Sequence, residues 1–174
     1  MQTTSQQRHH QHGDAPLDVD ALDLLGADHR LVREYFQHID AAAHASSAAD
    51  RHRRPDLIRQ VCDEIDIHSR IEEEIFYPAA RDALARHDDA LVDHAEHDHS
   101  QALELVAELR GLAPAAEAHA DALLGRLREL IERHMREEEE QLFPLVGPKL
   151  DTVALGRQLR QQRQALQEQM FGKC

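Results

Sequence analysis

Two stretches of the chain repeat the same pairing of a histidine with a glutamate. His68 stands four residues before Glu72, and His134 stands four residues before Glu138. Four residues is just over one helical turn, so each pair projects from one face of a helix. Two such pairs that face each other supply two imidazoles and two carboxylates to one small volume, which predicts a metal site with room for two ions.

The surrounding sequence assigns these residues, and two further histidines, to the interior. Leu, Ile and Val recur around them at the three- and four-residue spacing of a buried helix face. A buried carboxylate costs several kcal/mol unless it is paired or ligated, and hardly any Lys or Arg falls on these faces. Nitrogen and oxygen donors without cysteine suit iron, manganese or zinc. The predicted metal ligands are His29, His68, Glu72, His99, His134 and Glu138.

The number of these residues fits two metal ions. Of the predicted ligands, His29 and His68 from the first half of the chain would bind one ion. His99 and His134 from the second half would bind the other. Glu72 and Glu138 stand at equivalent places in the two halves and can bridge both ions. Each ion then keeps a coordination position for water or an incoming ligand, and on a redox metal such a position permits oxygen chemistry.

Four helical segments are needed to position these residues. Apolar stripes predict helices over about residues 18–45, from Pro55 onward, from residue 88 or 89 to Gly111, and from Pro114 to about residue 147. We expect the second stripe to continue through Ile75 and Ala79, with Pro78 kinking or ending that helix. We expect the fourth stripe to reach Leu145.

The first two helices are echoed by the second two. His29 and His99 are 70 residues apart, and His68 and His134 are 66 apart. Short links between long helices predict an all-α fold, an antiparallel up-down-up-down four-helix bundle over residues 17–148. Residues 1–16 are a polar tail that we expect to be disordered. Residues 149–174 hold an extra amphipathic C-terminal helix, which can dock on the bundle or form a homodimer.

Composition limits the partners and the compartment. The 174 residues carry 33 acidic and 20 basic side chains, a formal net charge of −13. Such a surface repels nucleic acid and anionic lipid, so neither is an expected partner. No apolar run approaches the length of a membrane span, and Cys62 and Cys174 form no disulfide framework. A cytoplasmic protein is expected.

Other acidic and histidine residues surround the predicted ligands. His99 alone matches both the apolar stripe of its helix and the repeat, although His94 or His97 could join the site as an outer group. A run of glutamates is expected to form a solvated face, and its first member adjoins the site. These residues are Glu73, Glu74, Glu137, Glu139 and Glu140.

At these residues the chain resembles the hemerythrin-like, or HHE cation-binding, family. The resemblance covers about residues 18–146 and has four parts in order. They are Asp28-His29, His68-x3-Glu72 with Phe-Tyr-Pro78, Asp98-His99, and His134-x3-Glu138 with Leu-Phe-Pro144. It implies an oxo- or hydroxo-bridged non-haem di-iron centre, with the four histidines as terminal ligands and the two glutamates as bridges.

Two departures from the family's oxygen carriers shape the expected function. Those carriers have a further histidine one turn from the third-helix ligand, where this chain has Ala95 and Leu103. They also use aspartate as the bridge that is Glu138 here. The resemblance therefore favours a protein that binds, senses or reacts with O2, NO or H2O2. A non-catalytic module for iron handling or sensing, with the C-terminal helix as output, stays open, as does a helical protein that holds zinc. Enzymatic activity is left undecided.

Overall fold

The computed structural model describes residues 19–84, 89–113 and 116–172. Within these residues the regular structure is helical and there is no strand, which confirms the all-α prediction. The expected polar tail over residues 1–16 lies outside the described residues. None of the helices in the described ranges combines the length and apolarity needed to cross a membrane.

The first pair of long helices begins with local signals that the sequence carries. Helix α1 (Ala21–Ala43) follows Asp20, whose side chain accepts hydrogen bonds from the backbone N–H groups of the first turn. Helix α3 (Arg54–Ile71) has Pro55 in its first turn, as predicted. The polar link between them forms a short helix, α2 (Ala48–His52), that the sequence did not predict.

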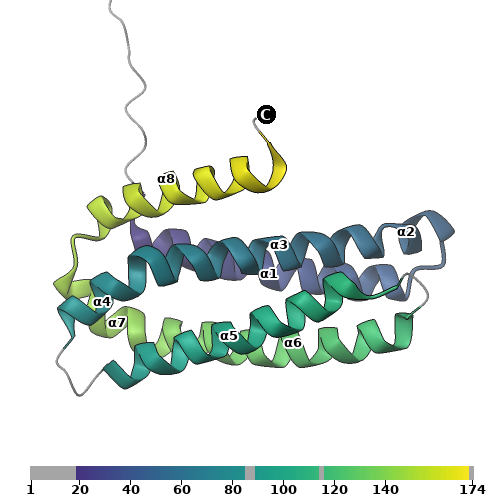
Figure 1. The fold of residues 1–174 in the computed structure, drawn as a ribbon, viewed down its shortest axis with the longest axis horizontal. Coiled ribbons are helices and arrows are strands. Elements are labelled where there is room, and N and C mark those ends of the chain that lie inside the picture. Colours follow the sequence, from purple (N-terminus) through teal and green to yellow (C-terminus); the bar gives the residue numbers. More distant parts are fainter. Residues whose placement is uncertain (1–18, 85–88, 114–115, 173–174) are drawn as a thin grey trace, which may run out of the picture.

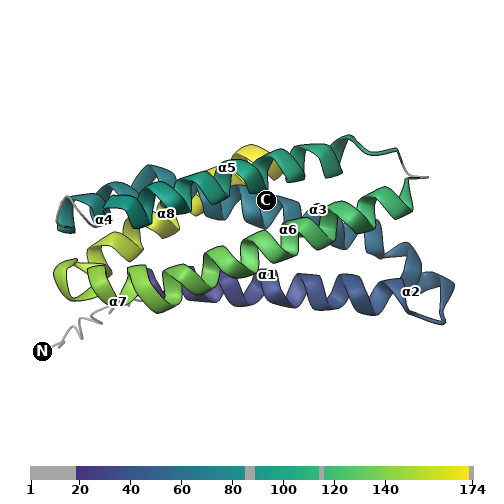
Figure 2. The ribbon, with the colours of Figure 1, turned by 90° about the horizontal axis from the view of Figure 1, so that it is seen from below.

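The second half of the bundle is also a pair of long helices. Helix α5 (Asp89–Gly111) ends at the predicted glycine, and helix α6 (Glu117–Glu137) carries the second His-x3-Glu pattern to its C-terminus. The contacts of α1 with α3, of α5 with α6 and of α3 with α5 bring the four helices side by side (Figures 1 and 2).

A π-helical turn follows each of the two helices that carry a His-x3-Glu pattern. Turn η1 (Glu72–Phe76) leads into α4 (Tyr77–Ala83), and η2 (Glu138–Leu142) leads into α7 (Phe143–Val146) and the 3-10 turn η3 (Gly147–Lys149). A proline in the first turn of α4 and of α7 has no N–H to donate, and its ring would clash with the carbonyl four residues earlier. The wider π turn relieves that clash and keeps the chain helical.

The π turns shift the buried face, so part of the predicted stripes was wrong. Ile75 and Ala79 are only partly buried, whereas Phe76 and Tyr77 are fully buried. Leu145 is likewise partly buried. A π turn holds one residue more than an α turn, so every later side chain is rotated around the helix by about one residue. Pro78 and Pro144, which lie inside the apolar patterns, are the sequence features that indicate this shift.

The apolar core is divided into two clusters along the bundle. One contains Val32, Ile65 and Ala102, and the other contains Leu25 and Ile71. The predicted ligands lie on the helices between these clusters, because His29 falls between Leu25 and Val32 in α1. The bundle thus has a polar layer closed by apolar side chains at both ends.

The C-terminal helix α8 (Thr152–Phe171) docks on the bundle. It contacts α1 and α3 on the side away from α5 and α6 (Figure 1). Leu155, Leu159 and Leu166 are buried there. At Gly156 the backbones approach so closely that an added Cβ would lie 2.0 Å from the carbonyl oxygen of Val19. Homodimer formation through α8 remains a prediction.

Candidate metal centre

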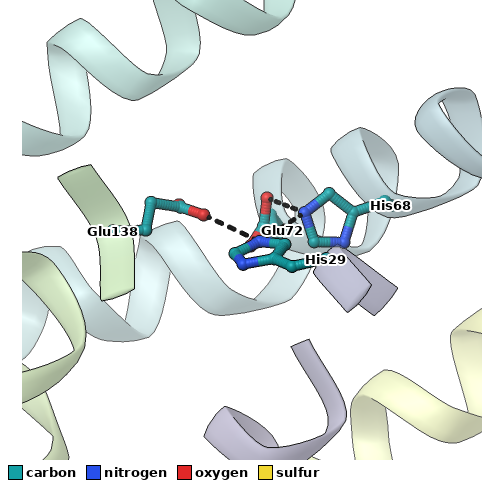
Figure 3. A group of neighbouring side chains, drawn as sticks. All are labelled: His29, His68, Glu72 and Glu138. Carbon is teal, nitrogen blue, oxygen red and sulfur yellow. Dashed lines mark hydrogen bonds and ion pairs between the residues drawn. The ribbon is translucent and has the colours of Figure 1, made fainter. Parts of the chain in front are cut away.

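The structure brings the six predicted ligands together in the polar layer. Each of these side chains is 6% exposed or less, and together they form two overlapping groups that could each hold a cation. The first group is His29, His68, Glu72 and Glu138 (Figure 3). The second is Glu72, His99 and His134. The side chains come from four helical segments, so only the assembled bundle makes the site.

The ring nitrogens of the histidines face each other in pairs. The Nε2 atoms of His29 and His68 are 3.2 Å apart, and those of His99 and His134 are 3.1 Å apart. Two lone pairs at this separation repel each other unless a proton or a cation lies between them. A cation bound by each pair would remove this repulsion.

Each buried glutamate reaches histidines from both halves of the chain. Glu72 Oε2 lies 3.1 Å from His68 Nε2 and 3.3 Å from His99 Nε2. Glu138 Oε2 lies 3.3 Å from His29 Nε2 and 3.4 Å from His134 Nε2. Each of the two carboxylates therefore lies within reach of one imidazole from each half of the chain.

Carboxylates on the outer side hold the rings of three histidines. His29 Nδ1 lies 2.8 Å from Glu139 Oε1, and His99 Nδ1 lies 3.2 Å from Glu73 Oε1. His68 Nδ1 lies 3.5 Å from Asp28 Oδ2. A carboxylate only accepts, so Nδ1 of each ring donates to it, and Nε2 is the ring nitrogen left to bind a metal ion once any proton on it is displaced. Glu73 and Glu139 are therefore more than members of the solvated face that the sequence predicted.

Tyr77 adds a phenol to the same volume. Its hydroxyl group donates to Glu138 Oε1 at 2.9 Å and to Glu72 Oε2 at 3.3 Å, and it lies 3.4 Å from His99 Nε2. Burial, and then the charges of the two glutamates, hold the pKa of Tyr77 well above its ordinary value. The phenol thus stays protonated and acts as a donor to both carboxylates.

The charges of the site are strongly coupled. Burial disfavours the charged ring of His68, but Glu72 and Asp28 outweigh it and raise its pKa to about 10. Burial lowers the pKa of His134 to about 4, so this ring stays neutral. For Glu72, burial is outweighed by His68 and His99, and its pKa is held well below the ordinary value. An arriving cation therefore meets an ionised carboxylate and displaces protons from the imidazoles.

Unsatisfied polar atoms show that the site fits a cation. Glu72 Oε1 and Glu138 Oε2 are buried and have no hydrogen-bond partner among the described residues. A buried carboxylate oxygen without a partner costs free energy comparable to a lost charged hydrogen bond. Imidazole nitrogen and carboxylate oxygen are ligands for iron, manganese or zinc, so a cation of this class would satisfy these atoms.

A small cavity touches one edge of the site. It lies between α5 and the end of α6 and is lined by Leu91, Ala95, His134, Glu137, Glu138 and Leu142. Its volume is about 10 Å³, which is space for roughly one water molecule. The small side chain of Ala95 lies on the α5 side of this cavity.

Two other histidines were weighed as additional members of the site. His97 is exposed, and its Nε2 atom lies 2.8 Å from Gln101 Nε2. His94 contacts Asp98 and Glu137 rather than the six ligands. Neither histidine joins the buried groups.

Sequence reasoning missed the residues that support the ligands. Glu139 lies in a run of glutamates, and its role depends on a helix more than 100 residues away in sequence. One signal was available, because Glu73 and Glu139 each follow a predicted bridging glutamate directly. Tyr77 stands in the Phe-Tyr-Pro78 part of the family pattern, but the π turn that directs it inward was not foreseen.

Comparison with known proteins agrees with this geometry. The family model described as the hemerythrin HHE cation binding domain matches residues 20–146, more than half of the chain. A protein of Nostoc sp. (strain PCC 7120) called DNA nickase is 22% identical over 135 residues. The match covers 78% of this chain but 36% of the Nostoc protein, so the chain spans about a third of that relative's length. No solved structure matches the chain.

Proposed function

Because the chain belongs to the hemerythrin HHE cation-binding family, we propose that it holds two iron ions and binds or reacts with a small oxidant or diatomic molecule. The candidates are O2, NO and H2O2. The centre would lie in an up-down-up-down bundle over residues 17–148, with residues 149–174 as an addition. The proposed terminal ligands are His29, His68, His99 and His134, and the proposed bridges are Glu72 and Glu138.

One observation carries this proposal. Four Nε2 atoms converge in a buried layer, and each of two ionisable carboxylates lies within 3.4 Å of one imidazole from each half of the chain. A single ion would bind only one of the two histidine pairs. In the other pair, the lone pairs of the two Nε2 atoms would still face each other. Two ions of the same class satisfy both pairs and use both glutamates as bridges.

The protein's own residues would prepare the site. When bound, the iron pair supplies redox electrons and a coordination position for a small ligand. Glu139, Glu73 and Asp28 hold the imidazole rings in the orientation that presents Nε2. The Tyr77 hydroxyl is a proton donor within reach of both glutamates. The apolar clusters on either side exclude bulk water, and the small cavity beside His134 favours molecules with two non-hydrogen atoms.

Metal content and colour test the proposal directly. After expression in iron-replete medium we expect about two irons per chain and charge-transfer absorption in the near ultraviolet. The double variant Glu72→Gln, Glu138→Gln should lose the paired metal and keep its helical circular dichroism. Colourless protein without iron would refute the proposal, and unchanged iron in the double variant would refute the ligand assignment.

A second candidate function is metal or redox sensing with α8 as the output. It is favoured by Arg163 of α8, which pairs with Asp28, the residue that accepts from the ring of His68. Assays of peroxide and nitric oxide consumption separate the two functions. A catalyst turns over many equivalents per chain, whereas a sensor reacts with no more than a stoichiometric amount.

Zinc in place of iron is the remaining alternative for the metal. Histidine and carboxylate ligands accept zinc, but a doubled site with bridging carboxylates suits redox iron better. Elemental analysis of the isolated protein decides between the two. We do not propose the DNA nicking named for the Nostoc relative as a function of this chain, because its net charge of −13 repels the phosphate backbone.

Pairing of two copies through α8 is part of the same proposal. Val153 and Phe171, both on α8, are the large hydrophobic side chains that the described residues expose, and Phe171 is 60% exposed. Analytical ultracentrifugation of the native protein and of the Phe171→Ser variant tests this. A native protein that stays monomeric across the accessible concentrations would exclude the pairing.

A further inference from the structure

A third group of potential ligands lies outside the buried centre. It consists of His94 and Asp98, one turn apart on α5, and Glu137, the last residue of α6. His94 Nε2 lies 3.3 Å from Glu137 Oε2 and 3.9 Å from Asp98 Oδ2. The His94 side chain is half exposed, so the group faces solvent on one side.

Asp98 is the residue that makes this group more than a surface contact. It is 1% exposed, and its Oδ2 atom is buried without a hydrogen-bond partner. The other oxygen, Oδ1, accepts from Arg133 Nη2 at 2.7 Å. Arg133 therefore fixes the carboxylate while Oδ2, on the His94 side, is left unsatisfied. Burying such an oxygen is costly, and a cation would remove that cost.

The charge and the donor types favour a divalent cation. Asp98 and Glu137 carry two negative charges, and the guanidinium of Arg133, which pairs with Asp98, brings the sum of these three charges to −1. One imidazole nitrogen and two carboxylate oxygens are a ligand set for zinc, manganese or ferrous iron. The open side lets water complete the coordination.

We propose that His94, Asp98 and Glu137 bind a third divalent cation and deliver it to the buried pair. Glu137 precedes Glu138 in the chain, and Asp98 precedes His99. Glu137 also lines the small cavity that reaches His134 and Glu138. A cation held there needs only a short transfer to reach the second histidine pair. The delivery role rests on the proposed function, whereas cation binding by this group does not.

Manganese binding measures the site directly. Protein of known iron content is titrated with Mn(II), and free Mn(II) is followed by its electron paramagnetic resonance signal. We expect the native protein to bind one equivalent more than the His94→Ala variant, or the variant to bind that equivalent at least about tenfold more weakly. Glu137→Gln should reproduce the loss. His97→Ala is the matched control, because it removes an exposed histidine of the same helix and should bind like the native protein.

The rate of iron loading tests delivery separately. Apoprotein is mixed with Fe(II) in air-saturated buffer, where O2 oxidises the bound iron, and the growth of the near-ultraviolet absorbance is followed by stopped flow. His94→Ala should load about tenfold more slowly than His97→Ala and reach the same final iron content. Equal Mn(II) binding by His94→Ala and His97→Ala would overturn the third site. Lost Mn(II) binding with an unchanged loading rate would overturn delivery. Absence of iron from every variant would overturn the proposed function, and the Mn(II) comparison would still decide the third site.

Discussion

Substitution of Arg163 by alanine should weaken metal binding without releasing helix α8. The Arg163 side chain is 16% exposed and pairs with Asp28, 10% exposed, and with Glu64 at 3.0 Å. Breaking a fully buried ion pair costs about 3–5 kcal/mol, and breaking an exposed one costs about 0–1 kcal/mol. A mostly buried pair should fall between these values, at about 2–3 kcal/mol.

The apolar contacts of α8 are larger than this loss. Leu155, Leu159 and Leu166 are each 7% exposed or less. Burial of one leucine contributes about 1.5–3 kcal/mol, so the three together contribute roughly 5–9 kcal/mol before the entropy of ordering the helix. Helix α8 should therefore stay docked, and circular dichroism of the variant should match that of the native protein.

The loss of Arg163 should lower the metal affinity of the site through its effect on Asp28. Without Arg163, the Asp28 carboxylate loses the group that holds it beside His68 Nδ1. Loss of such outer support costs about 10–100-fold in metal affinity. With the proposed pair of irons bound, we expect one of them to pass to a chelator at least about tenfold faster, which gives a biphasic trace. Arg163→Lys keeps the charge but not the forked geometry and should be intermediate.

Arg59→Ala is the matched control for this prediction. Arg59 is 62% exposed and pairs with Asp56 within the same helix, so its loss removes an arginine and an ion pair far from the ligands. Identical chelation traces for Arg163→Ala and Arg59→Ala would refute the coupling of α8 to the metal centre.

Three further predictions concern packing and buried groups. Tyr77→Phe removes the donor to Glu72 and Glu138 and should destabilise the apoprotein by about 1.5–3 kcal/mol in urea unfolding; unchanged stability would mean that this hydroxyl is not a donor there. Gly156→Ala should cost about 1–3 kcal/mol because its Cβ meets the backbone of Val19, whereas Gly125→Ala, with open space around it, should stabilise α6 by about 0.5–1 kcal/mol; equal unfolding midpoints would contradict the close approach of α8. Burial raises the pKa of Cys62 to about 11, so at pH 8 only about one thiol in a thousand is ionised, and alkylation in a variant without the other cysteine should be slow until denaturant is added; rapid labelling of the native protein would contradict this burial.

The site residues could be found from the sequence because they break a periodic pattern. His29 and His99 stand on stripes of apolar residues, and the repeat of the chain pairs them with the two His-x3-Glu patterns. The structure brings all six together, as that reasoning expected. Helix periodicity is local, so it survives in a single sequence.

The supporting residues depend on contacts that a single sequence does not carry. Glu139 reaches His29 across the bundle, and within its run of glutamates only its place directly after Glu138 distinguishes it from Glu140. The phase after each π turn was also missed, because regular α geometry was assumed through Pro78 and Pro144. The docking of α8 depends on the close approach of Gly156 to the backbone of Val19. This contact depends on two surfaces, so the sequence of α8 alone does not predict it.

The crossed support of the ligands bears on how such a chain could arise. His29 in the first half depends on Glu139 from the second, and His99 in the second half depends on Glu73 from the first. A single ancestral hairpin with this pattern could have oriented the imidazole of its second helix, as Asp28 does for His68, but not that of its first helix. Two copies would have had to exchange glutamates in a symmetric dimer. Gene duplication and fusion would then have turned contacts between molecules into contacts within one chain, after which each half was free to diverge.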